Sequence, residues 1–417
     1  MKIENVLCAV VRSGFFNWDL VAIKAGAKAN GFAFDGKPVT PGFTSICQPG
    51  TALSVILRLE DGQVAFGDCL DVILTGFAGR DPLFIAKDQK VVVEKEIRHR
   101  LIGRDLGKFR PLAAEIDGIV HNGKVIHTGL RFGITQALLH AVSLAHRTTM
   151  AEVIANEYDC VIAKAPIPIL ASSLHLDDNL MIDRMIMKQA ELLPHASIHH
   201  VERELGSDGG KLVAYASRLT KRIKEIGAPG YRPGIHFDVY GTFGELFKLD
   251  LNDIADYIGK LEKAVAPHDL LIETPVMCKS KKEQIVALRD LKSVIKKKGL
   301  KTKIIADDWC NTLQDIKEFV DAGAADIIQI KIPDLGGIHN TIDAVLYARR
   351  NDTGVCLGGT GNETDQSARI TTHIGLACNP SFLMAKPGFG GDEALMILTN
   401  EMVRTLALIE HGNARGK

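Results

Sequence analysis

Four segments between residues 234 and 337 each contain a short apolar run that is followed by a charged residue: GIHFDVYG (234–241), DLLIETP (269–275), KIIADDW (303–309) and DIIQIKIPDLGG (326–337). Apolar runs that alternate with longer amphipathic segments are typical of strands and helices in a parallel sheet. In such sheets the functional side chains gather at the carboxyl ends of the strands. We therefore expect the residues that end these runs to meet at one edge of the fold: Asp238, Glu273, Asp307 and Lys331.

The three acidic residues predict a metal site. Carboxylate oxygens that arrive from different strands form the kind of site that Mg²⁺ prefers, so Asp238, Glu273 and Asp307 are candidate ligands. The neighbouring Asp308 is predicted to point to the other side of its strand and is a weaker candidate. The alternative is that these acids cap helices or form salt bridges.

Gln329 and Lys331 are two residues apart and therefore lie on the same face of their predicted strand. A lysine near Mg²⁺ and partly removed from water is expected to have a lowered pKa and to act as a general base. The alternative is an ion pair between Lys331 and Asp307 or Glu273 without a chemical role.

His195 ends the run AELLPHA and is predicted to lie across the barrel mouth from Lys331. We expect it to act as an acid or base on the opposite face of a substrate. The other histidines of this region lack such a position and are interpreted as background: His175, His199, His200 and His236.

Eight strand-like runs after about residue 167 predict a (β/α)₈ barrel or a close variant; they end near Ala171, His195, Asp238, Glu273, Asp307, Lys331, Thr360 and Pro387. The competing fold, an open doubly wound sheet, would bring a glycine-rich phosphate turn after its first strand, and none is present. The first 160 residues differ. Residues 53–69 predict two strands joined by an Asp61-Gly62 turn, and helical stretches follow at 82–103 and 131–156. The expected domains are therefore residues 1–160 and 161–417.

The composition is that of an ordinary globular protein of 417 residues, with 46% hydrophobic and 24% charged residues. Lys+Arg and Asp+Glu balance at 50 each, which argues against nucleic acid or an anionic membrane as the main partner. We find neither a long apolar span nor a signal-peptide pattern. The eight cysteines show no pairing motif, which favours reduced thiols and a cytoplasmic location.

Two glycine-rich segments follow the last predicted strands. Thr360 and Gly361 lie in LGGTGNETD (357–365), where backbone N–H groups and a hydroxyl are suited to a carboxylate or a phosphate. KPGFGGDE (386–393) is predicted to form a second loop at the barrel mouth.

At these residues the chain resembles the enolase superfamily, and most closely the methylaspartate ammonia-lyase family. The resemblance spans nearly the whole length and rests on these segments: PVTPGFTS (38–45), GRDPLF (79–84), MIMK…LPH (185–195), HFDVYGT (236–242), the strand ends IETP and ADDWCNT, QIKIPDLGGIHN (329–340) with DAVLY (343–347), and GGTGNETD (358–365). It implies an enolase-type α/β fold with an N-terminal α+β capping domain, a C-terminal modified (β/α)₈ TIM barrel, and a homodimer.

The resemblance also implies a reaction. Mg²⁺ would be held by Asp238, Glu273 and Asp307, and Lys331 would remove the C3 proton of L-threo-3-methylaspartate, with His195 working on the opposite face. Gln329, Thr360 and the residue at position 361 would hold the substrate carboxylates. The expected products are mesaconate and ammonia, because chelation of a carboxylate stabilises the enediolate from which the β-ammonium is eliminated.

Three positions depart from the family pattern. The chain has Ile73 in place of a glutamine on the amine side of the substrate, Gly361 in place of a cysteine, and Ser172 or Ser173 in place of a second glutamine. The segment ASSLHLDDNL (171–180) is also one residue longer than the pattern. An unpaired buried ammonium is costly, so Ile73 leaves the leaving group open.

Two further interpretations therefore stay open. One is another lyase, dehydratase or epimerase acting on a related amino or hydroxy acid, which the changes at positions 73 and 172 favour. The other is a barrel that binds an anion without turnover, against which the intact Lys331 and His195 argue.

Overall fold

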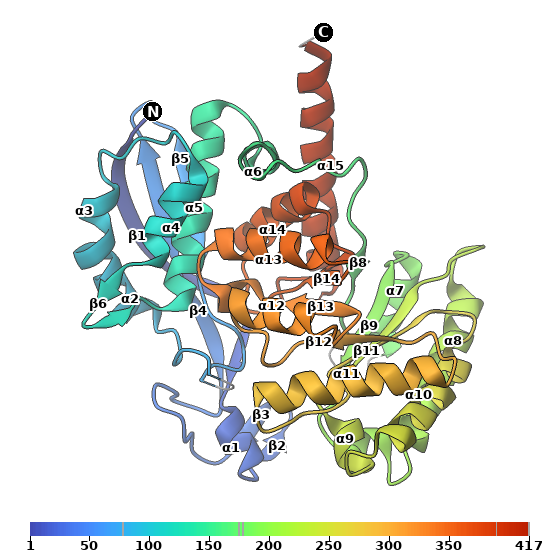
Figure 1. Ribbon diagram of the computed structural model, residues 1–417. Helices are drawn as coiled ribbons and strands as arrows, with labels where there is room; N and C mark the ends of the chain where they lie inside the picture. The colour runs from blue at the N-terminus through green and yellow to red at the C-terminus, as the bar shows by residue number, and fades with distance from the viewer. Residues whose placement is uncertain (77–78, 174–175, 177–178, 389, 416–417) are drawn as a thin grey trace.

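The computed structural model describes residues 1–76, 79–173, 176, 179–388 and 390–415. An N-terminal α+β part packs against a closed barrel of parallel strands, and the long helix α15 (Asp392–Arg415) extends from the barrel to the C-terminus (Figure 1). The predicted fold class is confirmed. Among the described residues no helix is long and apolar enough to cross a membrane.

The N-terminal sheet has the order β1-β4-β5 and is antiparallel. The two predicted strands are β4 (Cys47–Leu59) and β5 (Val64–Cys69), on either side of Asp61-Gly62. The first strand, β1 (Ile3–Trp18), was not predicted, because few of its residues are buried and its apolar residues do not alternate with polar ones. Short hairpins and one short helix complete this part: α1 (Leu20–Lys24), β2 (Lys28–Asn30) with β3 (Ala33–Asp35), and β6 (Val120–His121) with β7 (Lys124–Val125).

The helices of this part are α2 (Ala86–Val92), the π-helix η1 (Val93–Ile97), α3 (Arg98–Leu101), α4 (Phe109–Asp117), α5 (Thr128–His146) and α6 (Met150–Tyr158). The sheet packs against α2, α3 and α5, while α4 and α6 pack against α5. The single helical stretch expected at 131–156 is wrong, since two helices occupy it. Arg147 has a left-handed φ of 52°, and Thr149 then starts α6 with a capping box to Glu152. Gly133 brings α5 against β5, because a Cβ there would overlap the backbone of Cys69.

Eight parallel strands close the barrel in the order β8 to β15 and back to β8: β8 (Ile169–Leu170), β9 (Leu192–Ser197), β10 (Gly234–Asp238), β11 (Leu270–Glu273), β12 (Lys303–Ala306), β13 (Ile327–Ile330), β14 (Gly354–Leu357) and β15 (Phe382–Met384). Closure excludes the competing open sheet. Short helices follow two strands: η2 (Val201–Leu205) and η3 (Ile332–Leu335). The main helices around the barrel are α7 (Asn179–Met187), α8 (Gly210–Ile226), α9 (Thr242–Leu246), α10 (Leu251–Val265), α11 (Lys281–Lys297), α12 (Leu313–Asp321), α13 (Ile338–Arg350), α14 (Asp365–Cys378) and α15.

The inside of the barrel is filled by an apolar cluster: Leu170, Leu271, Ile305, Ile327, Cys356, Phe382 and Met384. Asp238 pairs in register with Glu273, and Glu273 pairs with Ile305. Because side chains two residues apart share a face, Asp307 lies on the same side as Ile305 and one step closer to the barrel mouth. The strand register alone therefore brings the three acids together.

The N-terminal part contacts the carboxyl end of the barrel directly. Gly14 N donates to the Asn362 carbonyl at 3.1 Å, and Ser13 Oγ donates to Asn362 Oδ1 at 3.1 Å. Arg80 reaches from the loop after β5 to Asp334, at 2.8 Å. These contacts hold the cap over the ends of β13 and β14.

Candidate active site

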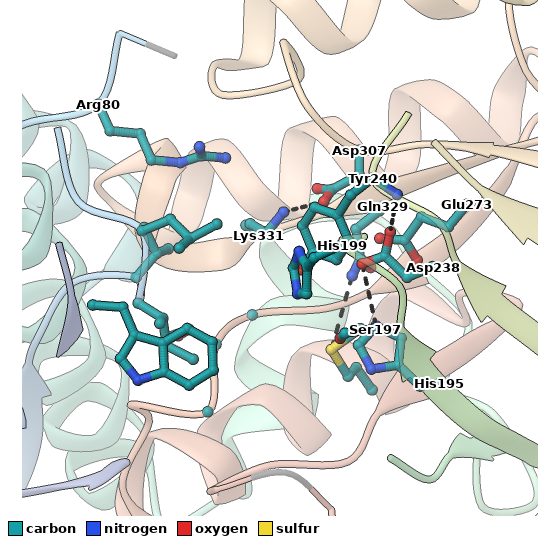
Figure 2. A pocket seen from close by; sticks show the side chains of 18 residues that line it. Arg80, His195, Ser197, His199, Asp238, Tyr240, Glu273, Asp307, Gln329 and Lys331 are labelled. Atoms are coloured by element: carbon teal, nitrogen blue, oxygen red, sulfur yellow. Dashed lines mark hydrogen bonds and ion pairs between the residues drawn. The ribbon is translucent and has the colours of Figure 1, made fainter. Parts of the chain in front are cut away.

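A cavity lies between the cap and the carboxyl ends of the barrel strands (Figure 2). It holds about 660 Å³ of empty space, its open mouth included. The cap contributes Trp18, Val72, Ile73, Leu74 and Arg80, and the barrel contributes His195, Ser197, His199, Asp238, Tyr240, Glu273, Asp307, Gln329, Lys331, Gly359, Thr360, Gly361 and Met384. Residues of the cap and residues of the barrel thus line one cavity.

The three predicted acids converge in this cavity. One carboxylate oxygen from each of Asp238, Glu273 and Asp307 lies within 4.8 Å of the others, and all three side chains are buried. Burial, and then repulsion by the neighbouring carboxylates, raises the pKa of Asp238 and of Glu273 well above the usual range. Glu273 Oε2 has no hydrogen-bond donor among the described residues. A buried oxygen without a donor and clustered carboxylates fit a hard divalent cation.

His236 lies beside this cluster, although its sequence context suggested background. It is two residues before Asp238 and therefore shares its inward face, a signal that was available in the sequence. Its Nε2 is 2.9 Å from Glu273 Oε2, at an angle outside that of a hydrogen bond. Burial lowers the pKa of His236 to about 3, so the ring is neutral at Glu273.

Lys331 lies at the end of β13 and donates to Asp307 Oδ2. The expected lowering of its pKa refers to a site that holds Mg²⁺, and it stays a prediction. Burial lowers the pKa of Lys331, but the carboxylates of Asp307 and Asp308 outweigh burial and raise it. The expectation assumed a neighbouring cation, whereas the pKa here reflects the charge of the carboxylates themselves. The ion pair that we considered as an alternative is therefore present.

His195 occupies a bulge in β9, since Pro194 pairs with His236 and Ala196 already pairs with Phe237. Its Nε2 lies 3.9 Å from Asp238 Oδ2, and its Nδ1 lies 3.1 Å from Ser172 Oγ. Burial, and then His236 and Lys331, lowers the pKa of His195 well below its usual value. Figure 2 shows His195 and Lys331 reaching the cavity from different strands.

Gln329, Thr360 and Gly361 line the cavity as expected. Gln329 Oε1 is buried and has no hydrogen-bond donor among the described residues, so it can accept one from a ligand. The backbone N–H of Thr360 is not free for an anion, because it donates to Glu363 Oε2 at 3.1 Å. The expectation for this loop concerned the N–H groups of its glycines and the Thr360 hydroxyl, and it stays a prediction.

The two positions that depart most from the family pattern have different surroundings. Ile73 lies in the cavity wall with Trp18 and Leu74, on an apolar side. Ser172 is buried and is not among the described residues that line the cavity; instead it contacts His195. A direct substrate contact by Ser172 therefore has no support in this geometry. His175 and part of the segment 171–180 lie outside the described residues.

Sequence reasoning missed several residues of the cavity. Arg80 is buried, forms an ion pair with Asp334 Oδ2 at 2.8 Å, lies 3.7 Å from Asp308 Oδ1 and donates to Asn311 Oδ1 at 3.0 Å. The pairing of Asp308 with Arg80 agrees with its predicted direction away from the acids. Trp18, Ser197 and Tyr240 were also missed. His199, which was interpreted as background, lines the cavity as well, and its ring is tilted against that of Tyr240 with the ring centres 4.1 Å apart. For Arg80 the only signal was its place in GRDPLF.

The closed barrel, the cap and the acids beside Lys331 define an enzyme of the enolase superfamily. Comparison with known proteins narrows the assignment. Residues 1–159 match the family model for the N-terminus of methylaspartate ammonia-lyase, and residues 161–411 match the model for its C-terminus. The chain therefore belongs to the methylaspartate ammonia-lyase family.

Individual relatives agree over the full length. Methylaspartate ammonia-lyase 1 of Carboxydothermus hydrogenoformans is 49% identical over 98% of this chain and 97% of its own. The β-methylaspartase of Clostridium tetanomorphum, solved as a Mg complex, superposes with a TM-score of 0.95 at 46% identity and covers 99% of this chain and 100% of its own. The Citrobacter amalonaticus enzyme, solved with (2S,3S)-3-methylaspartic acid, gives a TM-score of 0.96 at 44% identity, over 98% and 100% of the two chains.

Proposed function

We propose that this protein is a Mg²⁺-dependent ammonia-lyase that converts 3-methylaspartate to mesaconate and ammonia. The observation that carries the proposal is the convergence of three buried carboxylates and Lys331 in one cavity. The names of the relatives support the substrate, and the Mg complex of one of them supports the metal.

The donor set suits the metal. Mg²⁺ would be held by Asp238, Glu273 and Asp307, and would act as a Lewis acid that makes the proton next to a chelated carboxylate easier to remove. Lys331 is the base that takes the C3 proton on one face. The C2–N bond then breaks and ammonia leaves. His195 serves the opposite face, and Gln329 accepts a hydrogen bond from the substrate or from a water that accompanies it.

A second candidate is elimination or epimerisation of a related amino or hydroxy acid. The observation that favours it is the apolar side of the cavity formed by Trp18, Ile73 and Leu74. An ammonium placed against this side would lose its hydrogen bonds to water without a replacement. A substrate with a neutral or alkylated leaving group would fit it better.

One experiment separates the two candidates. The protein with Mg²⁺ is incubated in D₂O with a panel of amino- and hydroxy-dicarboxylates, and the substrate protons are followed by NMR. Mesaconate formed from 3-methylaspartate, lost in Lys331→Ala and on addition of EDTA, supports the proposal. Reaction of hydroxy acids alone refutes it in favour of the second candidate.

A variant tests the role of Ile73. Ile73→Gln is expected to shift the substrate preference toward acids with a free ammonium group, with Val72→Ile as a matched apolar control at the same cavity wall.

We also propose a homodimer in the cytoplasm and a domain boundary near residue 160. Exposed apolar side chains on α15 support self-association, since Met396, Val403 and Leu408 are 50–63% exposed. The eight cysteines are free thiols, which fits a reducing compartment. Light scattering of the purified protein tests the dimer, and a monomer at micromolar concentration would contradict it.

The proposed domain boundary near residue 160 is supported by the change from α6, which ends at Tyr158, to the first barrel strand at Ile169.

A further inference from the structure

Ser172 makes two contacts with a single residue. It follows β8, is only 1% exposed, and its Oγ lies 3.2 Å from the His195 carbonyl oxygen and 3.1 Å from His195 Nδ1. A hydroxyl has one proton to donate and two lone pairs to accept with. The two contacts can therefore both be hydrogen bonds only if Ser172 donates to one atom and accepts from the other.

The direction of these bonds follows from the backbone. A carbonyl oxygen cannot donate, and the His195 carbonyl sits in the β9 bulge, outside the regular pairing with β10. The contact of Ser172 Oγ with this carbonyl is therefore a hydrogen bond only with Ser172 as the donor. The single hydroxyl proton then belongs on this bond. His195 Nδ1 must then carry the proton that Ser172 accepts.

We propose that Ser172 is a positioning residue that holds neutral His195 as the Nδ1–H tautomer and leaves an unprotonated Nε2 toward the cavity. The short serine side chain is suited to fixing the tautomer, because its hydroxyl reaches both the carbonyl oxygen and the ring Nδ1 of His195.

The consequence for the reaction rests on the proposed function. Nε2 can accept the C3 proton from the face opposite to Lys331, because its lone pair is not occupied. The C3–H bond breaks, the proton moves to Nε2, the electron pair stays on the substrate, and the C2–N bond then breaks to release ammonia. His195 becomes an imidazolium whose Nδ1–H still donates to Ser172. Because the proposed function already places Lys331 and His195 on opposite faces, each C3 epimer of 3-methylaspartate depends on one of these two bases.

The tautomer is tested directly by NMR of the holoenzyme with Mg²⁺ and ¹⁵N-labelled histidine. The His195 signals are assigned by difference from His195→Gln, and the two nitrogens are distinguished by their couplings to the ring protons. We expect a protonated Nδ1 and an unprotonated Nε2, retained in Ser172→Thr and lost as the dominant form in Ser172→Ala. A protonated Nε2 in the neutral ring of the unmodified holoenzyme overturns the proposal.

Turnover of the two C3 epimers provides a second readout that a loss of stability would not produce. Ser172→Ala is expected to lower kcat for the His195-dependent epimer about 10²-fold, with KM and the Lys331-dependent epimer changed little. Ser172→Thr should restore the rate. Ser143→Ala is the matched control, since Ser143 is buried and its hydroxyl donates to the His140 carbonyl at 2.7 Å, away from the cavity. Equal losses on both epimers overturn the proposal. If the unmodified enzyme turns over neither epimer, the proposed function fails and the NMR spectrum alone decides the tautomer.

Discussion

Replacing Lys386 by methionine is expected to destabilise the barrel by about 3–5 kcal/mol. Lys386 and Glu363 form an ion pair of 2.6 Å beneath the loop that carries Thr360, and their side chains are 1% and 0% exposed. Lys386 Nζ also donates to the Gly358 carbonyl at 2.5 Å. Methionine keeps the length of the side chain but removes the charge and both contacts.

The size of the effect follows from the buried Glu363 carboxylate, which loses its partner when Lys386 is replaced. An ionised Glu363 without its partner is a buried charge, and breaking a buried pair on one side typically costs this amount. For a barrel of this size the loss corresponds to a fall in Tm of roughly 10 °C. Glu363→Gln removes the stranded charge while its carbonyl can still accept from Thr360 N. The double variant should therefore recover about 2 kcal/mol of the loss.

The effect should depend on pH in a defined direction. Burial raises the pKa of Glu363, and Lys386 opposes this shift. Without Lys386 the folded-state pKa rises further above the unfolded value of about 4.3. The carboxyl is protonated in both states below that value, so the loss of stability is small there and grows as the pH rises toward the folded-state pKa.

Urea unfolding of the parent, the two single variants and the double variant, at about pH 5 and pH 8, measures these quantities. Lys281→Met is a control, because Lys281 is half-buried in its ion pairs with Asp315 and Glu318, far more open to water than Lys386, and its loss should cost less than about 1 kcal/mol. A loss below that size in Lys386→Met, or no recovery in the double variant, would refute the account of the pair.

Two further outcomes are expected. Asp71 accepts hydrogen bonds from Phe84 N at 2.7 Å and Asn17 Nδ2 at 3.1 Å, and burial raises its pKa to about 7. Its folded-state pKa thus exceeds the unfolded value, so its contribution to stability is present at low pH and is lost as the pH rises toward 7. The stability difference between the parent and Asp71→Asn should fall by up to about 1.4 kcal/mol per pH unit between pH 4 and 7, and a constant difference in urea unfolding would contradict this. His236→Leu should weaken Mg²⁺ binding about 10-fold or more, measured by calorimetry, because the neutral His236 ring lies 2.9 Å from Glu273 Oε2 and restricts the position of that oxygen; unchanged affinity in His236→Leu would show that the contact is incidental.

The barrel and the convergence of the acids could be predicted because their signals are local. Asp238 and Glu273 each end a buried apolar run, and parallel strands place such ends side by side. The alternation of strands and helices also separated the barrel from the N-terminal part. Short-range periodicity was sufficient for these features.

Other features depend on contacts that the local sequence does not encode. Arg80 meets Asp334 across more than half of the chain, and its sequence context carries no sign of that partner. The direction of Ser172 toward His195 follows from a bulge in the neighbouring strand, which the alternation of residues does not reveal. The direction in which the pKa of Lys331 shifts depends on the charges around it, which its residue type does not reveal.

The position of Trp18 gives the protein an internal optical probe. The chain has two tryptophans, and Trp18 lies in the cavity wall while Trp309 follows Asp308 on the barrel side. A ligand that displaces water from the cavity changes the polarity around the Trp18 indole, so its emission should report binding without a label. In Trp18→Phe the remaining emission comes from Trp309, which allows the response of the cap to be separated from that of the barrel.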